Sequence, residues 1–199
     1  ATQKRYWFHT KPNINILINQ AKSDIKNSDL EAEILKRISD KIRKIDLFNV
    51  IVNPSQDIPE QQKPTLLILS PKYIISQNDI DEKIIKLIEN ISTKKGKSER
   101  IYRNTIIFLG CSEIGINKLN SDIRDYLGCQ KVNQEYSFQL EREQKDDLKQ
   151  KIDDNSKQAD NSIAVAYNQI LKFTGSEGIK ALQLKQFKSS IEDQINSNL

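Results

Sequence analysis

Methionine is absent from this sequence of 199 residues, and histidine and tryptophan each occur once. Because a native chain starts with an initiator methionine, we expect a processed product or a domain cut from a longer protein. The scarcity of histidine restricts catalysis, since a Ser-His-Asp or Cys-His site could use no imidazole other than His9. His9 follows Tyr6, Trp7 and Phe8, and a packing or hydrogen-bonding role is favoured there.

Cysteine is also scarce, and the two cysteines lie far apart in the sequence at Cys111 and Cys129. Neither has a second cysteine or a histidine at metal-ligand spacing. We therefore expect two small buried residues in a reducing compartment rather than a disulfide or ligands. Asp146-Asp147 and Asp153-Asp154 could hold a loose cation, but solvated helix acids are the favoured interpretation. The sequence predicts no catalytic, cofactor-binding or metal-binding residue.

Long hydrophobic runs are missing as well. No run approaches the roughly 18 apolar residues of a membrane-spanning helix, and no basic leader precedes an apolar stretch, so we expect a cytoplasmic protein without a membrane contact. The 31 basic and 27 acidic residues give a net charge of +4, and the two signs interleave along the chain. This distribution is typical of solvated helix faces, whereas nucleic-acid modules usually show a stronger local excess.

Apolar residues do recur at helical spacing in several segments. The pattern predicts helices over residues 14–25, 28–45, 79–95 and 116–127. Ser28 and Glu31 fit a capping box at the second of these. Gly96 follows the third helix and Gly128 the fourth, where glycine permits a helix to end.

Three short runs are apolar on both faces, at residues 48–52, 65–69 and 105–109. Such runs are typical of strands buried between layers of helices, and residues 5–9 fit a further short strand. Strands that alternate with helices favour a largely parallel sheet covered by helices. The fold class predicted is therefore α/β, with an α/β domain over residues 1–135.

No strand is predicted after about residue 136. Apolar residues at helical steps predict one long helix that continues to about residue 170, and a last helix is predicted over residues 179–195. Gly175 and Gly178 separate them. We therefore expect a long-helix region over residues 136–199, able to pack on a neighbour or to self-associate.

The segment Gly110 to Gly115 (GCSEIG) follows a strand and leads into a helix, as a phosphate-binding loop does. That loop needs Lys and then Ser or Thr after its second glycine, but Ile116 and Asn117 stand there and Lys118 comes too late. Ser112 is better interpreted as a helix N-cap, with Glu113 as a first-turn acid. A structural turn is favoured over a nucleotide site.

Two basic groups stay candidates for contacts. Lys94, Lys95, Lys97 and Arg100 could bind nucleic acid, together with base stacking by Tyr6, Trp7 and Phe8. The alternatives are complementation of a helix dipole by the lysines and anchoring of the N-terminus by the aromatics.

Arg103 and Asn104 precede the third strand. The guanidinium could reach a phosphate or another domain, or simply pair with an acid.

Several segments together resemble one family: RYWFHTKPNINILINQ, FNVIVNP, LLILSP, YRNTIIFLGCS, YLGCQKV and AVAYNQIL. These are the large predicted AAA-type ATP-binding proteins, catalogued as a domain of unknown function and found near phage-defence genes. The resemblance covers residues 5–172 and is most specific at Tyr6-Trp7, Arg103-Asn104 and Ala166-Tyr167. Gly110 departs from the family, which tends to have small non-glycine residues there.

The resemblance implies that the nucleotide-binding loop lies upstream of this chain, so that ATP and Mg²⁺ are expected only in the parent protein. The chain would then be a non-catalytic structural or regulatory domain of an ATPase, in contact with its other domains or with partner proteins. The alternative is a nucleic-acid-binding module of a defence-related protein. A self-contained hydrolase with an unfamiliar site is a third, weaker hypothesis.

Overall fold

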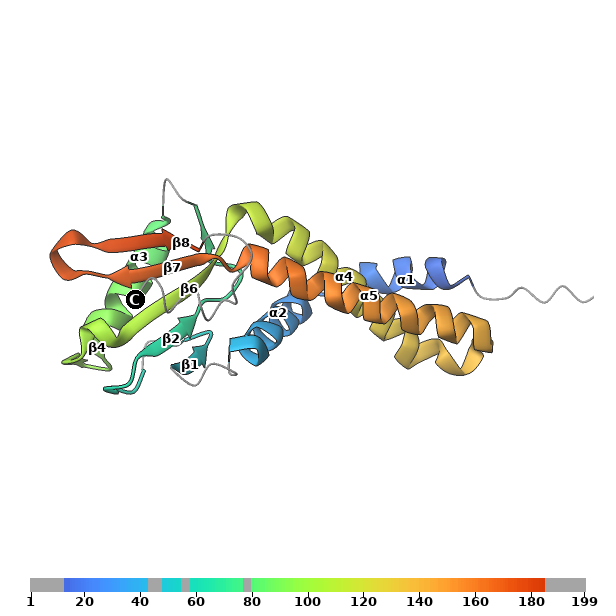
Figure 1. The fold of residues 1–199 in the computed structure, drawn as a ribbon, viewed down its shortest axis with the longest axis horizontal. Helices are drawn as coiled ribbons and strands as arrows, with labels where there is room; N and C mark the ends of the chain where they lie inside the picture. Colours follow the sequence, from blue (N-terminus) through green and yellow to red (C-terminus); the bar gives the residue numbers. More distant parts are fainter. Residues whose placement is uncertain (1–12, 43–47, 55–57, 77–79, 185–199) are drawn as a thin grey trace, which may run out of the picture.

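The computed structural model describes residues 13–42, 48–54, 58–76 and 80–184. It consists of a sheet covered by helices on both faces, which we call the head, and a long helical arm (Figure 1). The elements in chain order are α1 (Ile14–Ser23), α2 (Asn27–Ile42), β1 (Asn49–Val52), β2 (Thr65–Ile68), β3 (Ile74–Ile75), α3 (Glu82–Thr93), β4 (Lys94–Lys95), β5 (Ser98–Glu99), η1 (Arg103–Thr105), β6 (Ile106–Ser112), α4 (Glu113–Tyr136), η2 (Ser137–Gln139), α5 (Arg142–Ala166), β7 (Gln169–Phe173), η3 (Gly175–Glu177) and β8 (Ile179–Gln183).

The sheet has the strand order β1-β2-β6-β7-β8, and the short β3 also pairs with β6. β1, β2, β6 and β3 form parallel pairs, whereas β7 and β8 are antiparallel to their neighbours. The predicted α/β class and the three predicted strands are confirmed. The sheet is mixed, however, since β7 and β8 add antiparallel pairs to its parallel part.

Alternate residues of β2 serve opposite faces of the sheet, as the pleat requires. Leu66 and Ile68 pack toward α2 and the ends of α4 and α5 that lie nearest the sheet. Leu67 and Leu69 pack toward α3 on the other face. All four side chains are fully buried, which explains why this strand is apolar on both sides.

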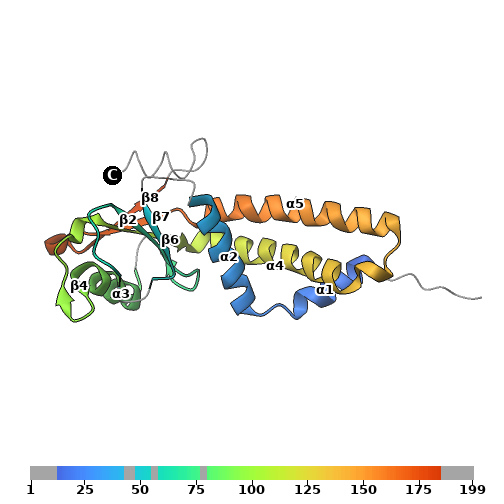
Figure 2. The same ribbon diagram turned by 90° about the horizontal axis from the view of Figure 1, so that it is seen from below.

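The arm is a helical hairpin, α4 and α5, inserted between two neighbouring strands of the sheet. β6 leads into α4 and α5 returns to β7, and β6 and β7 then pair antiparallel, with Leu109 opposite Ile170. With 24 and 25 residues, the helices are each about 36 Å long at 1.5 Å per residue. Figure 2 shows α4 lying between α5 and α1, so the outer arm is a three-helix structure with its own apolar cluster.

Two glycines of α4 allow close approaches to neighbouring helices. A Cβ built on Gly115 would lie 2.6 Å from Cα of Ala166, where α4 and α5 meet at the sheet. A Cβ on Gly128 would lie 2.7 Å from Cγ of Lys22 in α1. The prediction that a helix ends near Gly128 is wrong, because this glycine serves helix packing and α4 continues to Tyr136.

The prediction that residues 136–199 are helical is wrong for β7 and β8. α5 ends at Ala166, and Tyr167 and Asn168 turn the chain back to the edge of β6. The long helix predicted to residue 170 therefore ends earlier, and residues 179–183 form a strand instead of a helix start. The domain boundary predicted at residue 135 falls beside the end of α4 and stays a prediction.

Other predicted ends also differ. α2 begins at Asn27, and Ser28 lies inside it with its hydroxyl donating to Asp29, so the Ser28–Glu31 capping box is not formed. α3 ends at Thr93 rather than at Lys95. The strand predicted over residues 5–9 and most of the last predicted helix lie outside the described residues. Across the described ranges, no helix is long and apolar enough to cross a membrane.

Candidate functional site

The parallel strands end at one edge of the sheet, where open α/β folds usually bind ligands. Ser70, just after β2, is fully buried and donates its hydroxyl to the carboxylate of Glu31 in α2. The Tyr167 hydroxyl donates to the Leu69 carbonyl at 3.0 Å, and the Ser112 hydroxyl donates to the Ala166 carbonyl at 3.2 Å. These polar groups at the carboxyl edge are thus bound within the protein itself.

The GCSEIG segment forms no loop. Gly110 to Ser112 complete β6, and α4 starts directly at Glu113. Ser112 holds the N-cap position as expected, but its side chain makes no cap hydrogen bond and instead contacts Ala166. Lys118 lies 2.9 Å from Asp122. The first lysine after this segment in the sequence is therefore held by a carboxylate of its own helix.

A small pocket of about 200 Å³ opens beside this edge. It lies between the start of α2, the residues after β2 and α4, and is lined by Asn27, Leu30, Glu31, Ile34, Pro71, Lys72 and Asn120. The Glu31 carboxylate already accepts from Ser70, and Lys72 is the cation among the lining residues. The lining mixes polar and apolar side chains and has no excess of either charge.

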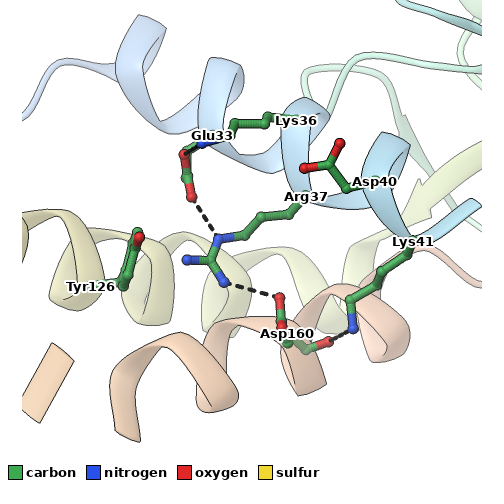
Figure 3. A pocket seen from close by; sticks show the side chains of 7 residues that line it. All are labelled: Glu33, Lys36, Arg37, Asp40, Lys41, Tyr126 and Asp160. Carbon is green, nitrogen blue, oxygen red and sulfur yellow. Dashed lines mark hydrogen bonds and ion pairs between the residues drawn. The ribbon is translucent and has the colours of Figure 1, made fainter. Parts of the chain in front are cut away.

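A larger cleft of about 300 Å³ lies where α2 crosses α4 and α5 (Figure 3). Its charged and aromatic lining comes from all three helices: Glu33, Lys36, Arg37, Asp40, Lys41, Tyr126 and Asp160. Three of these residues are basic and three are acidic. The charges converge on one another, so the cleft has no net charge to select an ionic ligand of either sign.

Arg37 is the centre of this arrangement. Its Nε donates to Glu33 at 2.7 Å, and its Nη1 donates to Asp160 at 2.9 Å and to the Ser156 hydroxyl at 3.2 Å. The guanidinium also lies 4.0 Å from the ring centroid of Tyr126, a cation–π distance. One side chain of α2 thereby contacts both helices of the arm.

The electrostatics of Arg37 fit a structural contact. Burial by itself would lower its pKa, but the hydrogen bonds to Glu33 and Asp160 outweigh burial and raise it. The guanidinium therefore stays charged. Lys41 adds a hydrogen bond from Nζ to the Asp160 carbonyl at 3.2 Å, as Figure 3 shows. We call this set of contacts the Arg37 clamp, since it fastens the arm to α2.

The predicted basic cluster lies on a hairpin. Lys94 and Lys95 form β4, and Gly96, with φ of 57°, opens the two-residue turn to β5. Glycine suits the first position of such a turn, so the expectation that Lys94 and Lys95 lie in the last helical turn is wrong. Lys97 follows in the turn, and all three lysines are exposed.

Arg100 differs from the lysines because it is buried. Its Nε donates to the Ile91 carbonyl at 3.0 Å and its Nη2 to the Ile58 carbonyl at 2.9 Å. The guanidinium holds the end of α3 against the segment before β2. Arg100 is thus an internal anchor, placed differently from the solvent-facing contact that its sequence neighbours suggested.

Arg103 and Asn104 lie in η1, at the amino edge of the parallel strands and both exposed. Arg103 pairs with Glu99 at 3.1 Å and donates to the Arg100 carbonyl at 3.2 Å. The ion pair with an acid, one of the two predicted alternatives, is therefore present. Arg103 pairs with Glu99 of the lysine hairpin, so the structure brings Arg103 and the three lysines, but not the buried Arg100, onto one surface.

The remaining candidates are separate. His9 and its aromatic neighbours lie outside the described residues. Asp146, Asp147, Asp153 and Asp154 are exposed on α5. Within the described ranges, no three or more His, Cys, Asp or Glu side chains are grouped so that they could hold a metal ion.

Comparison of the chain with family models, with curated proteins and with solved structures gives no match. The Arg37 clamp was not predicted from the sequence. Its only local signal is the pair Glu33 and Arg37, four residues apart on one helix, a spacing at which opposite charges meet.

Proposed function

We propose that the chain is a non-catalytic structural or regulatory domain of a larger AAA-type ATPase, and that its helical arm contacts other domains or partner proteins. The observation that carries this proposal is the Arg37 clamp. It joins α2, which covers the sheet, to α4 and α5 of the arm. A force or displacement at the end of the arm would therefore reach the head as a rigid movement.

The end of the arm is suited to contact. Phe138 lies in η2, between α4 and α5, and its side chain is 75% exposed. A single exposed apolar residue is ordinary on a protein surface. At the tip of a projecting hairpin, however, an aromatic residue is placed to meet a partner, and aromatics are enriched in interfaces.

The carboxyl edge of the sheet supports a scaffold rather than an ATP site. The hydroxyl groups of Ser70, Ser112 and Tyr167 donate hydrogen bonds to acceptors within the protein. In addition, β6 leads directly into α4 without a loop. Both features fit the resemblance described above, in which the nucleotide-binding loop belongs to another part of the parent protein.

Two measurements test the proposal. Titration calorimetry of this chain with ATP and Mg²⁺ should give no binding at micromolar concentration, and micromolar affinity would contradict the scaffold role. In the protein that contains this domain, Phe138→Ser should change the ATP hydrolysis rate severalfold while the Tm of the isolated chain stays the same.

The matched control is Ile114→Ser, which makes a similar polarity change at an 81% exposed residue in the first turn of α4, at the sheet end of the arm. It should leave ATP hydrolysis unchanged. If Phe138→Ser and Ile114→Ser both have no effect, the arm does not mediate contacts and the proposal is wrong. If both have the same effect, the position at the arm tip has no special role, which also contradicts it.

A further inference from the structure

A second surface lies at the opposite end of the molecule from the arm tip. We call it the amino-edge surface, and it comprises Lys94, Lys95, Lys97, Ile101, Tyr102 and Arg103. The β4–β5 hairpin, the short segment after β5 and η1 supply these residues at the edge where the parallel strands begin. Figure 1 shows β4 at the end of the long axis away from α4 and α5.

This surface is held firmly from below. Arg100 bonds to the carbonyls of Ile91 and Ile58 beneath the hairpin. Glu60 accepts hydrogen bonds from the backbone amides of Ile101 and Tyr102, the latter at 2.8 Å. The exposed side chains therefore project from a fixed backbone, which lowers the entropy lost when they bind.

The charge of the surface is positive. The three lysines are exposed, and none forms a salt bridge with another described residue. Two acids lie beside the surface: Glu99 pairs with Arg103, and Glu60 binds backbone amides and also feels the charge of Lys95, which helps to lower its pKa. The three lysines and Arg103 still outnumber these two acids, and the spread of the lysines along a hairpin suits a chain of charges better than one ion.

Apolar and aromatic groups accompany the lysines. Ile101 is 78% exposed and Tyr102 is 41% exposed. The Tyr102 hydroxyl accepts from Gln62 at 3.3 Å, which fixes the ring by its polar end and leaves part of the ring open. Cations beside an open ring are the combination that binds single-stranded nucleic acid, with phosphates on the cations and a base on the ring.

We infer that the amino-edge surface binds single-stranded nucleic acid, with Lys94, Lys95 and Lys97 on the phosphates and Tyr102 against a base. A duplex fits less well, because its base faces are covered by their stacked neighbours. This inference goes beyond the proposed scaffold function and is independent of the Arg37 clamp, so either can fail alone.

The probe is a fluorescein-labelled 20-nucleotide oligothymidylate, with binding followed by fluorescence anisotropy between 20 and 200 mM salt. Each phosphate neutralised by a cation contributes about −0.7 to the slope of log K against log salt for single strands. The triple substitution Lys94→Gln, Lys95→Gln, Lys97→Gln should weaken binding at least tenfold and reduce the slope by about 2.

The matched control changes the same net charge elsewhere. Lys145→Gln, Lys149→Gln, Lys157→Gln removes three exposed lysines of α5 and should leave affinity and slope almost unchanged. Tyr102→Ala should weaken binding about fivefold or more without changing the slope, because it removes stacking and no charge. Tyr102→Phe, which keeps the aromatic ring, should bind the oligonucleotide as tightly as the unsubstituted chain.

Several outcomes would overturn the inference. One is the absence of binding at 20 mM salt. A second is equal loss in the two triple variants, which would mean that only net charge matters. A third is a preference for polyglutamate or for phosphatidylserine vesicles over the oligonucleotide, which would identify an acidic peptide or a lipid surface as the partner. Far-UV circular dichroism of each variant checks that the fold is retained.

Discussion

Arg37 of α2 and Asp160 of α5 lie 123 positions apart in the chain, and their side chains meet at 2.9 Å between Nη1 and Oδ1. The same guanidinium binds Glu33 on its own helix and lies against Tyr126 of α4. The Arg37 side chain is only 10% exposed. One residue thus fixes three helices in position.

Replacement of Arg37 by methionine should lower the free energy of unfolding by about 2 kcal/mol, because Glu33 and Asp160 lose charge-assisted hydrogen bonds in a partly buried site. The check is urea unfolding at pH 7, read as a shift in midpoint without a change in the m-value. Lys86→Met is the control. Lys86 and Glu82 form an exposed pair, so its loss should cost at most about 0.5 kcal/mol. Equal effects of the two variants would show that the Arg37 clamp adds no stability.

Gly115→Ala should destabilise the protein by about 1–3 kcal/mol, since the new methyl group would lie 2.6 Å from the backbone of Ala166 and the helices would have to separate. Gly128→Ala is the matched change in the same helix. There the obstacle is mainly the Lys22 side chain, which can rotate, and alanine also gains helix propensity of about 1 kcal/mol over glycine. Thermal unfolding of both variants should place Gly115→Ala clearly below Gly128→Ala, and the reverse order would contradict the close approach at Gly115.

Cys111 and Cys129 should react with a thiol reagent such as DTNB only as fast as the protein unfolds. Burial raises the pKa of the Cys111 thiol to about 12. Burial also raises the pKa of Cys129, although a hydrogen bond from Asn155 works in the opposite direction. At pH 8 both thiols are therefore protonated and covered, and the thiolate is the reactive form. The variants Cys111→Ala and Cys129→Ala report each thiol separately, and rapid labelling of either native variant would refute the expected burial of the remaining thiol.

The raised pKa of Cys111 also gives a sign for the pH dependence. In the unfolded chain this thiol loses its proton near pH 8.5–9, whereas the folded protein retains it. The contribution of Cys111 to the free energy of unfolding is therefore complete below about pH 9 and is lost as the pH rises toward 12. Cys111→Ala should remove this part of the alkaline loss of stability.

The pH dependence of stability that arises from Glu60 has the opposite sign to that from Cys111. The hydrogen bond from the backbone of Tyr102 is the largest cause of the lowered pKa of Glu60. Desolvation opposes this effect, but the amide of Ile101 and the charges of Lys95 and Arg100 lower the pKa further. The stabilisation is therefore present above the unfolded pKa of about 4.3 and is lost as the pH falls through the lower folded value. The variant Glu60→Gln should be less stable than the unsubstituted chain at pH 7, and the difference in stability should be smaller at pH 3.

Urea midpoints at the two pH values measure this difference. Glu82→Gln, which alters an exposed helix acid paired with Lys86, should have a smaller effect at pH 7. If the urea midpoints of Glu60→Gln and the unsubstituted chain differ by the same amount at both pH values, the charge of Glu60 is not what holds the backbone of residues 101 and 102.

The buried strands could be predicted because their local pattern and their tertiary role agree. Leu66 to Leu69 are apolar in succession, and both faces of β2 are in fact covered. The strand β7 could not be predicted in this way. Ile163, Ala166 and Ile170 keep a helical spacing with no glycine or proline between them, yet the chain leaves the helix after Ala166. The long-range pairing of Ile170 with Leu109 decides its structure, and local sequence contains no sign of it.

The candidate sites also combine features that local sequence predicts with features that only long-range contacts decide. Gly96 is a sound signal for a change of chain direction, but a helix end and a hairpin turn both use glycine, so the sequence pattern predicts the wrong element for Lys94 and Lys95. Arg100 looks like its basic neighbours in sequence and differs only through backbone carbonyls at Ile58 and Ile91. Asp160 gives no hint of its partner Arg37, because that contact exists only once the arm has folded.

The insertion of α4 and α5 between β6 and β7 has a consequence for the order of folding. Two strands that pair side by side are separated by the whole helical hairpin, so the loop closed by their pairing is long and its entropic cost is high unless the helices shorten it first. If the helical hairpin of α4 and α5 forms early, it brings Ser112 and Ala166 together. β7 then lies beside β6 almost as if a tight turn joined the two strands. Assembly should then proceed from the helices inward, with the antiparallel side of the sheet closing last.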